Sequence, residues 1–297
     1  MLNRVKKIVI VLFFIICSLI IICGIVSVVV VLVPKKRIIV EYTGERVSIV
    51  SYDGKTMVGY LKKREKKSSK WAILIHSYRS DHTFMNPYAE KYLDNGYNIL
   101  QPDNRAHGQS EGNYIGLGYL DQYDILEWIK YIIIEDPGAE IVLHGVSMGA
   151  TAAMILSGQE GLPENLVAII ADCGYKSAKD YLSWKINHKL HLPAFPIIQI
   201  SNLSFKIAAG YYLEDCSAIN QVVHSKKPLL LIHGSADATV PVEDAYELYR
   251  AASCQKDIYI AQGAGHAESL FVDENIYWEK VFGFINRFLS YSCVHTG

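Results

Sequence analysis

The sequence predicts an α/β fold: a mainly parallel, eight-stranded central sheet with helices on both faces, preceded by one N-terminal transmembrane helix. Short apolar runs alternate with segments whose apolar residues recur at helical spacing. One run leads into Gly145-Val146-Ser147-Met148-Gly149 and then into a helix of small residues. A charge-free stretch, 8–33, is long enough to cross a bilayer.

Eight short apolar segments are the expected strands: 46–51, 57–62, 71–75, 97–101, 141–144, 166–171, 228–233 and 258–261. Asp53-Gly54 joins the first two in a hairpin, so these should form an antiparallel edge. Helices are expected before Gly96, over 117–135, after Ser147, and over 241–252 and 274–290. Because strands and helices alternate beyond the hairpin, the rest of the sheet should be parallel.

The apolar stretch 8–33 is expected to be an uncleaved signal anchor. It ends in Val-Val-Val-Leu-Val, which offers no small-residue cleavage site, and Ile22 stands where a lipoprotein would need a small residue before Cys23. Basic residues flank it almost equally, so the positive-inside rule gives little guidance. We expect a single-pass membrane protein with a cytoplasmic tip and anchor in 1–37. The domain 38–297 should be extracytoplasmic, held away from the bilayer by a linker, 34–42.

Ser147 is the candidate nucleophile. An apolar strand precedes the G-x-S-x-G pentad and a helix follows it, which is the context in which this motif exposes a serine on a sharp turn. Gly145 and Gly149 lack a Cβ, so neighbouring backbones can approach closely there. The positive end of the following helix is directed at the same place.

A nucleophilic serine requires a histidine and an orienting acid, which follow this motif in the order acid, histidine. Asp237 follows the strand 228–233, and His266 follows the strand 258–261. Asp172, at the end of the strand 166–171, is the rival for the acid. We favour Asp237 because the sequence around Asp172 lacks the context of an acid loop.

These motifs, in this order, resemble the α/β-hydrolase superfamily of serine hydrolases. More narrowly, the chain resembles bacterial membrane-associated Bem46-like and serine aminopeptidase-like esterases. The resemblance implies an oxyanion hole made by the backbone N–H groups of Tyr78 and Met148. Ser77 and Ala106 stand where the family usually has glycine. The resemblance also implies a lid inserted at about 175–224, where the alternation of strands and helices lapses.

The resemblance implies a membrane-anchored serine hydrolase that cleaves carboxylic esters, including lipid or other acyl esters, through an acyl-enzyme. A peptidase or amidase of the aminopeptidase-like type is the alternative. A non-catalytic anchored binding module is a third reading from another class. The expected partners are a small-molecule or lipid ester and the membrane. No cofactor or metal is expected, and a net charge of −1 gives no sign of nucleic-acid binding.

Several other polar residues have structural interpretations. Asp103, Arg105 and His107 are expected to hold a loop through hydrogen bonds and an ion pair. His188 and His191 have no accompanying third ligand in the sequence, so a metal site there is not favoured. The six cysteines show no C-x-x-C spacing and are expected to be free thiols.

Overall fold

The computed structural model describes residues 2–34 and 44–290. Eight strands form one sheet in the order β1-β2-β4-β3-β5-β6-β7-β8. The strands are β1 (Glu45–Val50), β2 (Thr56–Lys62), β3 (Lys70–Ile75), β4 (Asn98–Pro102), β5 (Glu140–Val146), β6 (Leu166–Asp172), β7 (Leu229–Gly234) and β8 (Lys256–Ala261). Only the pairings of β2 with β1 and with β4 are antiparallel, and all other pairs are parallel. The predicted fold, with its antiparallel edge, is confirmed.

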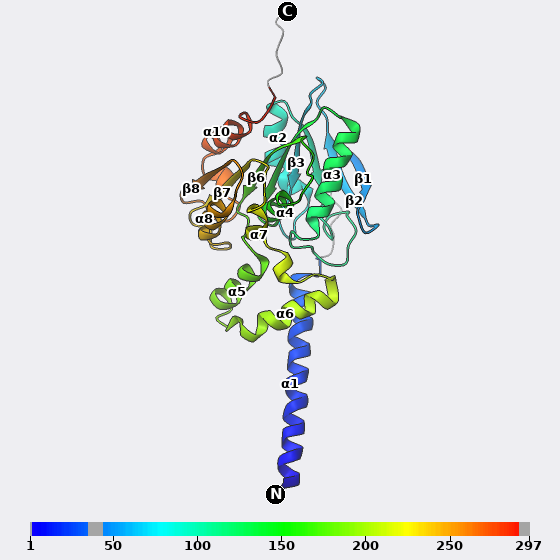
Figure 1. Cartoon of the computed structure of the whole chain (residues 1–297), viewed down its shortest axis with the longest axis vertical. Helices are drawn as coiled ribbons and strands as arrows, with labels where there is room; N and C mark the ends of the chain where they lie inside the picture. Colours follow the sequence, from blue (N-terminus) through cyan, green and yellow to red (C-terminus); the bar gives the residue numbers. More distant parts are fainter. Residues whose placement is uncertain (1, 35–43, 291–297) are drawn as a thin grey trace, which may run out of the picture.

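Helices cover both faces of the sheet (Figure 1). The helices of the body are α2 (Asn86–Asp94), α3 (Asp121–Glu135), α4 (Met148–Ser157), α7 (Ala218–Val222), α8 (Val242–Ala251), α9 (Ser269–Val272) and α10 (Glu274–Ile285). One apolar cluster joins the sheet to α3, α4 and α8, and includes Trp128 and Leu248. A second joins it to α2 and α10 through Tyr88, Tyr92 and Trp278.

One predicted helix begins later than expected. The apolar spacing suggested a helix from residue 117, but α3 begins at Asp121. Leu117 and Gly118 both have positive φ, at 49° and 90°, which a right-handed helix cannot accommodate. The Asp121 carboxylate instead accepts the Gly118 N–H at 2.8 Å at the start of the helix.

A long N-terminal helix, α1 (Leu2–Val31), projects from the body (Figure 1). Its apolar length is sufficient for one membrane span, and almost none of that span is buried. The predicted linker lies mostly outside the described residues, as does the boundary at 37/38. The described residues nevertheless show that the end of the predicted anchor contacts the domain. Leu32, just after α1, is fully buried, and its carbonyl accepts the Ile115 N–H at 2.8 Å.

The segment predicted to form a lid contains α5 (Ala178–Lys189), α6 (Ala194–Ala209), the short 3₁₀ helix η2 (Leu213–Asp215) and α7. Helices α5 and α6 lie at the end of the body from which α1 emerges, and α6 crosses α1 (Figure 1). A third apolar cluster joins this segment to the body through Tyr175, Phe205 and Met148. The segment therefore packs over the carboxyl end of β5, although its action as a lid stays a prediction.

Candidate active site

Ser147 lies on a strained turn between β5 and α4. Its φ of 55° and ψ of −115° are unusual for a residue with a side chain. A Cβ at Gly145 would lie 2.3 Å from the carbonyl oxygen of Gly149, and one at Gly149 would lie 2.3 Å from that of Ile75. Only glycine fits at these two positions, which explains the spacing of the pentad.

Ser147, His266 and Asp237 form a continuous chain of hydrogen bonds. Ser147 Oγ lies 2.9 Å from His266 Nε2, and His266 Nδ1 lies 2.7 Å from Asp237 Oδ2. The other carboxylate oxygen, Asp237 Oδ1, accepts the N–H groups of Thr239 at 2.7 Å and Val240 at 2.9 Å. These contacts orient the carboxylate so that His266 carries its proton on Nδ1 and presents Nε2 to the serine.

A second histidine contacts Asp237, and sequence reasoning missed it. His233, at the end of β7, is buried, and its Nε2 lies 3.2 Å from Asp237 Oδ2 and 3.1 Å from the carbonyl oxygen of Val240. Burial alone would raise the pKa of Asp237, but hydrogen bonds from His233 and His266 outweigh it and hold that pKa well below its usual range. In the sequence, only the four-residue spacing between His233 and Asp237 indicated that the two residues could be in contact.

Asp172, the rival acid, lies in a different environment. Its Oδ2 accepts the hydroxyl of Tyr277 at 2.9 Å, while its backbone carbonyl accepts the Ser147 N–H at 2.8 Å. Burial raises the pKa of the Asp172 carboxyl to about 6. The structure therefore brings Asp237 to His266 and places Asp172 beneath the turn that carries Ser147.

The two candidate oxyanion donors, Tyr78 and Met148, line the same pocket as Ser147. Met148 is the first residue of α4, so its N–H lies at the positive end of that helix. Tyr78 lies in the loop after β3, where positive φ falls on Arg79 at 56° rather than on Ser77. The backbone of this loop therefore does not require glycine at position 77.

Buried histidines fix the loop that carries Tyr78. His107 Nε2 accepts the Arg79 N–H at 2.9 Å, and His76 Nε2 accepts the Asn104 N–H at 2.9 Å. Burial lowers the pKa of His76, which keeps its ring neutral and able to accept. These bonds tie the loop after β3 to the loop after β4.

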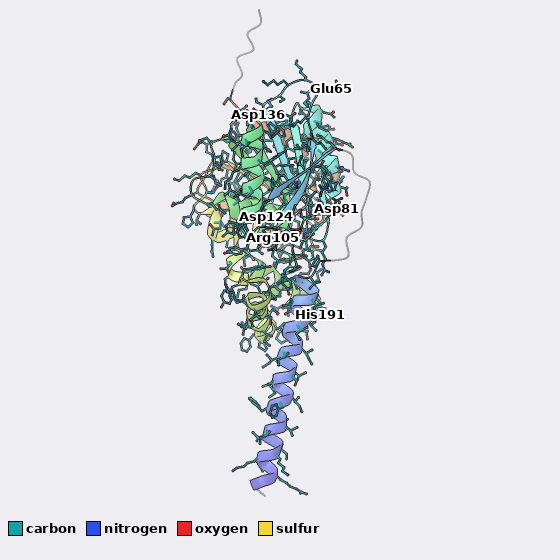
Figure 2. All side chains as sticks on the ribbon, turned by 90° about the vertical axis from the view of Figure 1, so that its right-hand side faces the viewer. Glu65, Asp81, Arg105, Asp124, Asp136 and His191 are labelled. Carbon is teal, nitrogen blue, oxygen red and sulfur yellow. The ribbon has the colours of Figure 1, made fainter. Side chains whose placement is uncertain are left out.

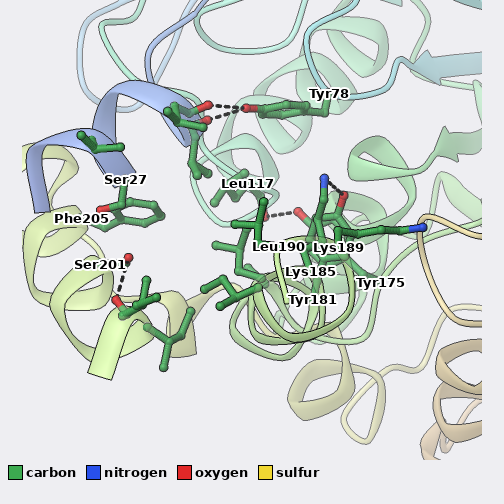
Figure 3. Close-up of a pocket in the computed structure, with 18 of the residues that line it drawn as sticks. Ser27, Tyr78, Leu117, Tyr175, Tyr181, Lys185, Lys189, Leu190, Ser201 and Phe205 are labelled. Carbon is green, nitrogen blue, oxygen red and sulfur yellow. Dashed lines mark hydrogen bonds between the residues drawn. The ribbon is translucent and has the colours of Figure 1, made fainter. Parts of the chain in front are cut away.

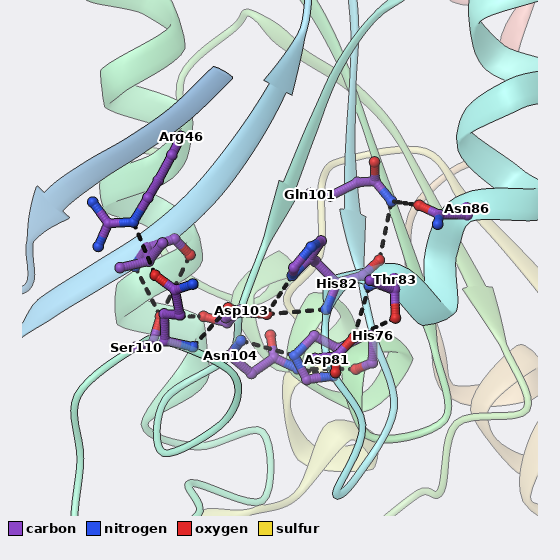
Figure 4. Close-up of polar contacts among 12 residues, drawn as sticks. Arg46, His76, Asp81, His82, Thr83, Asn86, Gln101, Asp103, Asn104 and Ser110 are labelled. Carbon is purple, nitrogen blue, oxygen red and sulfur yellow. Dashed lines mark hydrogen bonds and ion pairs between the residues drawn. The ribbon is translucent and has the colours of Figure 1, made fainter. Parts of the chain in front are cut away.

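Asp103 organises the polar network beneath these loops (Figure 4). Its Oδ1 accepts the backbone N–H of His82 at 3.0 Å and lies 2.8 Å from His82 Nδ1. Its Oδ2 accepts the Gln109 N–H at 2.8 Å. A Cβ at Gly108, which has positive φ, would lie 2.1 Å from this carboxylate, so glycine is required there. The contacts match a structural role for the 103–112 loop.

Arg105 is buried within an ionic cluster on the other side of that loop. It bonds Asp124 through Nε at 3.0 Å and Nη2 at 2.7 Å, and Asp53 through Nη1 at 2.7 Å. Ser51 donates a short hydrogen bond to Asp124. Arg105 and Asp124 lie side by side at the lower end of the body, above α5 and α6 (Figure 2). The cluster therefore joins the β1–β2 turn to α3 and takes no part in the site around Ser147.

A pocket of about 530 Å³ adjoins Ser147 and Met148 (Figure 3). Its walls come from α5, α6, the loop after β3 and the last turns of α1. Most of the lining is apolar, and its charged side chains are Arg79, Lys185 and Lys189. The described residues that line it include no carboxylate side chain.

Only one group of possible metal ligands was found among the described residues, and it lies at this site. Ligand atoms of Cys173, Asp237 and His266 fall within 4.8 Å of one another. Burial raises the pKa of the Cys173 thiol well above its usual value, so the sulfur stays protonated and is a poor ligand. Since Asp237 and His266 already bond each other, the group fits a hydrogen-bonded site better than a metal site.

The sheet order, the strained serine turn and the Ser147–His266–Asp237 contacts define an α/β hydrolase. Within that class, residues 83–290 match the family model of the prolyl oligopeptidase family, Peptidase_S9. Because this match covers more than half of the chain, the protein belongs to that family.

The relatives include two uncharacterized bacterial proteins. The chain is 28% identical to YqkD of Bacillus subtilis over 201 residues, which make up 67% of this chain and 66% of YqkD, just under two thirds of its length. It is 23% identical to YfhR of Escherichia coli K12 over 253 residues, 82% of this chain and 81% of YfhR.

Solved structures share the fold. The esterase Pf2001 of Pyrococcus furiosus superposes with a TM-score of 0.72 and 24% identity, over 87% of this chain and 99% of that chain. An acylaminoacyl peptidase superposes with a TM-score of 0.58 and 18% identity, over 80% of this chain and 41% of that chain. At these identities the likeness shows the fold alone.

Proposed function

We propose that the protein is a membrane-anchored serine hydrolase that cleaves carboxylic esters. The observation that carries the proposal is the hydrogen-bond chain from Ser147 Oγ through His266 to Asp237. A serine hydroxyl at neutral pH needs such a base to become a nucleophile. The pKa of Asp237, held low by its histidine neighbours, keeps the carboxylate charged beside the imidazole.

The reaction then runs in two halves. Ser147 Oγ bonds to the acyl carbon while its proton moves to His266 Nε2. The ester C–O bond breaks, and His266 returns the proton to the departing alcohol. Water next gives a proton to His266 as it attacks the acyl carbon. The bond from that carbon to Ser147 Oγ then breaks, His266 returns the proton to Oγ, and the carboxylic acid leaves. Throughout, Asp237 holds the ring tautomer and stabilises the imidazolium.

The N–H groups of Tyr78 and Met148 are the proposed donors to the oxyanion. Each such donor typically contributes roughly 3–4 kcal/mol to transition-state stabilisation. The fixed loop after β3 supports this role for Tyr78, since a preorganised donor does not have to be ordered during the reaction. Met148 is the first residue of α4, and the positive end of that helix supports the same role for its N–H group.

Cleavage of a peptide or amide bond is the second candidate, and membership of the prolyl oligopeptidase family favours it. Recognition of a free amino end requires an acidic group near the serine. The residues that line the pocket instead carry Arg79, Lys185 and Lys189. This charge favours the ester reading over an aminopeptidase. A non-catalytic binding module is less favoured still, because a complete serine–histidine–acid chain is present.

The test uses the full-length protein in detergent with a fluorophosphonate probe. The wild type should be labelled, Ser147→Ala should not, and the control Ser183→Ala, on α5, should be labelled normally. A panel of matched 4-nitrophenyl esters and aminoacyl 4-nitroanilides then separates the two chemistries. Labelling of Ser147→Ala would refute the nucleophile, and faster cleavage of the anilides would favour the peptidase.

We also propose that α1 is a single membrane span and that the hydrolase domain is extracytoplasmic. The length of α1 and its exposed apolar surface support the span. The orientation rests on the usual arrangement of a single N-terminal anchor, whose amino end stays inside, because the basic residues on the two sides of the span nearly balance. The protein should stay with membranes in high salt and dissolve only in detergent. Protease should reach the domain from outside sealed right-side-out vesicles, and protection there would reverse the orientation.

A further inference from the structure

The anchor helix forms part of the candidate active site. Five residues of α1 line the pocket beside Ser147: Cys23, Val26, Ser27, Val30 and Val31. Their spacing of three and four residues places them on one face of the helix. Ser27 lies beside Phe205 of α6 in the wall of this pocket (Figure 3). A membrane tether needs only to be apolar and long enough. Tethering alone therefore does not explain why one face of α1 lines the pocket.

This face is held in place at both ends. A Cβ at Gly24 would lie 2.4 Å from Ser204 Oγ, so α1 and α6 cross in close contact at this glycine. Small residues allow such close crossings. At the other end, Tyr78 Oη donates to the Val31 carbonyl at 2.7 Å, and Arg79 Nη2 donates to the Val30 carbonyl at 2.7 Å. The pocket wall is therefore a fixed part of the protein.

In the membrane span proposed above, this face lies at the membrane surface. A span of the hydrocarbon core needs about 20 residues. The charge-free stretch begins at Ile8, so about 20 residues from there end close to Ser27, in the middle of the pocket-lining face. The pocket then lies at the boundary between hydrocarbon and head groups. Ester carbonyls of membrane lipids occupy that same depth.

The lid presents a surface suited to this depth. Leu203 and Ile207 lie one turn apart on α6 and are 57% and 78% exposed, and Phe195 is 73% exposed. The α5–α6 connection, marked by His191, lies below the body, at the level of the upper part of α1 (Figure 2). Large exposed apolar groups of this kind mark contact surfaces. Lys185 and Lys189 of α5, which line the pocket, supply positive charge on the lid, and such charge attracts anionic lipid head groups.

We infer that the substrate is a membrane-resident acyl ester whose acyl chain enters from the bilayer along the Cys23–Val31 face of α1. This inference rests on the proposed ester hydrolysis and identifies its substrate class. The chain would lie between α1, α5 and α6, with its carbonyl carbon at Ser147 Oγ. The apolar lining suits such a chain, and the pocket volume is within the range of about 300–1,000 Å³ that is typical of ligand sites.

The first test separates entry from the bilayer from entry through water. Full-length protein is reconstituted in phosphatidylcholine–phosphatidylglycerol vesicles. 4-Methylumbelliferyl oleate is placed either in the same vesicles or in separate ones. Hydrolysis should be about tenfold or more faster when enzyme and ester share a bilayer, because sharing raises the local concentration. Equal rates in the two arrangements would overturn the inference.

The second test fills the pocket from α1. Val26→Trp and Val30→Trp place a ring on the lining face, whereas Val29, on the same turns, does not line the pocket. Val26 is 51% exposed, Val30 58% and the control Val29 53%, so the three positions are closely matched in exposure. The ratio of oleate to acetate hydrolysis should fall about tenfold in the two lining variants and stay unchanged in Val29→Trp.

Fluorophosphonate labelling of Ser147 in every variant measures the folded fraction. It also separates failure of the inferred substrate entry from failure of the proposed ester hydrolysis. An unchanged ratio in both lining variants would overturn the inference while leaving ester hydrolysis in place. A wild type that neither reacts with the probe nor hydrolyses 4-methylumbelliferyl acetate would instead refute the proposed function.

Discussion

The hydroxyl of Tyr78 donates a 2.7 Å hydrogen bond to the backbone carbonyl of Val31. The bond joins the loop that carries a proposed oxyanion donor to the last turn of α1. Arg79, the next residue, bonds the carbonyl of Val30 on the same turn. The carbonyls at the end of α1 are thus satisfied by the candidate active site, as a helix C-terminus requires.

The first prediction concerns this bond. Tyr78→Phe should lower the free energy of unfolding by about 1 kcal/mol, since one hydrogen bond is lost. It should also lower kcat more than it changes KM for a short soluble ester, because the N–H of residue 78 would be held less firmly. Thermal unfolding and steady-state kinetics in detergent measure the two effects. Tyr246→Phe, on the exposed side of α8, is the control, and a stability loss with unchanged kcat would limit Tyr78 to a structural role.

The second prediction separates the two candidate acids. Asp237→Asn should reduce kcat by roughly 10³–10⁴-fold, because an amide cannot hold His266 in the required tautomer or stabilise its charge. Asp172→Asn keeps an acceptor for Tyr277 and should remain close to wild type. Kinetics with a soluble ester measure both variants. A large loss in Asp172→Asn together with a mild loss in Asp237→Asn would reverse the assignment.

The third prediction concerns the pH dependence of stability. Burial raises the pKa of Asp172 to about 6 from the ordinary value of 3.8. Between these values the folded protein retains a proton that the unfolded chain releases, so this group lowers stability as pH rises from about 4 to about 6. Asp172→Asn should weaken that decline in unfolding experiments across this range. The exposed control Asp94→Asn should keep the wild-type slope, and an unchanged slope in Asp172→Asn would refute the raised pKa.

The fourth prediction concerns the buried ionic cluster. Arg105→Met should lower the free energy of unfolding by about 3–5 kcal/mol, because Asp124 would remain buried without its partner. Thermal unfolding measures the change. Arg250→Met, at an exposed position of α8, should be nearly neutral. A near-neutral Arg105→Met would show that the cluster contributes little to stability.

Much of the fold could be predicted because its signals are local. Parallel strands buried on both faces appear as short apolar runs, as in β5, β6 and β7. The pentad around Ser147 marks one specific turn, so its position needs no long-range information. The start of α3 could not be predicted, because helical spacing does not reveal the positive φ of Leu117 and Gly118.

The part of the site formed by α1 was missed for a physical reason. Where every residue of a helix is apolar, periodicity cannot distinguish a packed face from one that faces lipid. The small residues Cys23, Gly24 and Ser27 were the only trace of a close helix crossing. His233 was missed because its contact with Asp237 depends on how the loop after β7 folds back toward the strand.

The docked end of α1 divides this one helix into two parts with different tolerance to mutation. In the proposed membrane span, residues from Ile8 to about Ile22 need only remain apolar, so many substitutions among aliphatic side chains should be neutral there. From Cys23 onward, the size and position of each side chain shape a binding surface. A foreign apolar helix of equal length would therefore leave the pocket with an open side. For this chain, docking of α1 on the domain is a step in completing the pocket.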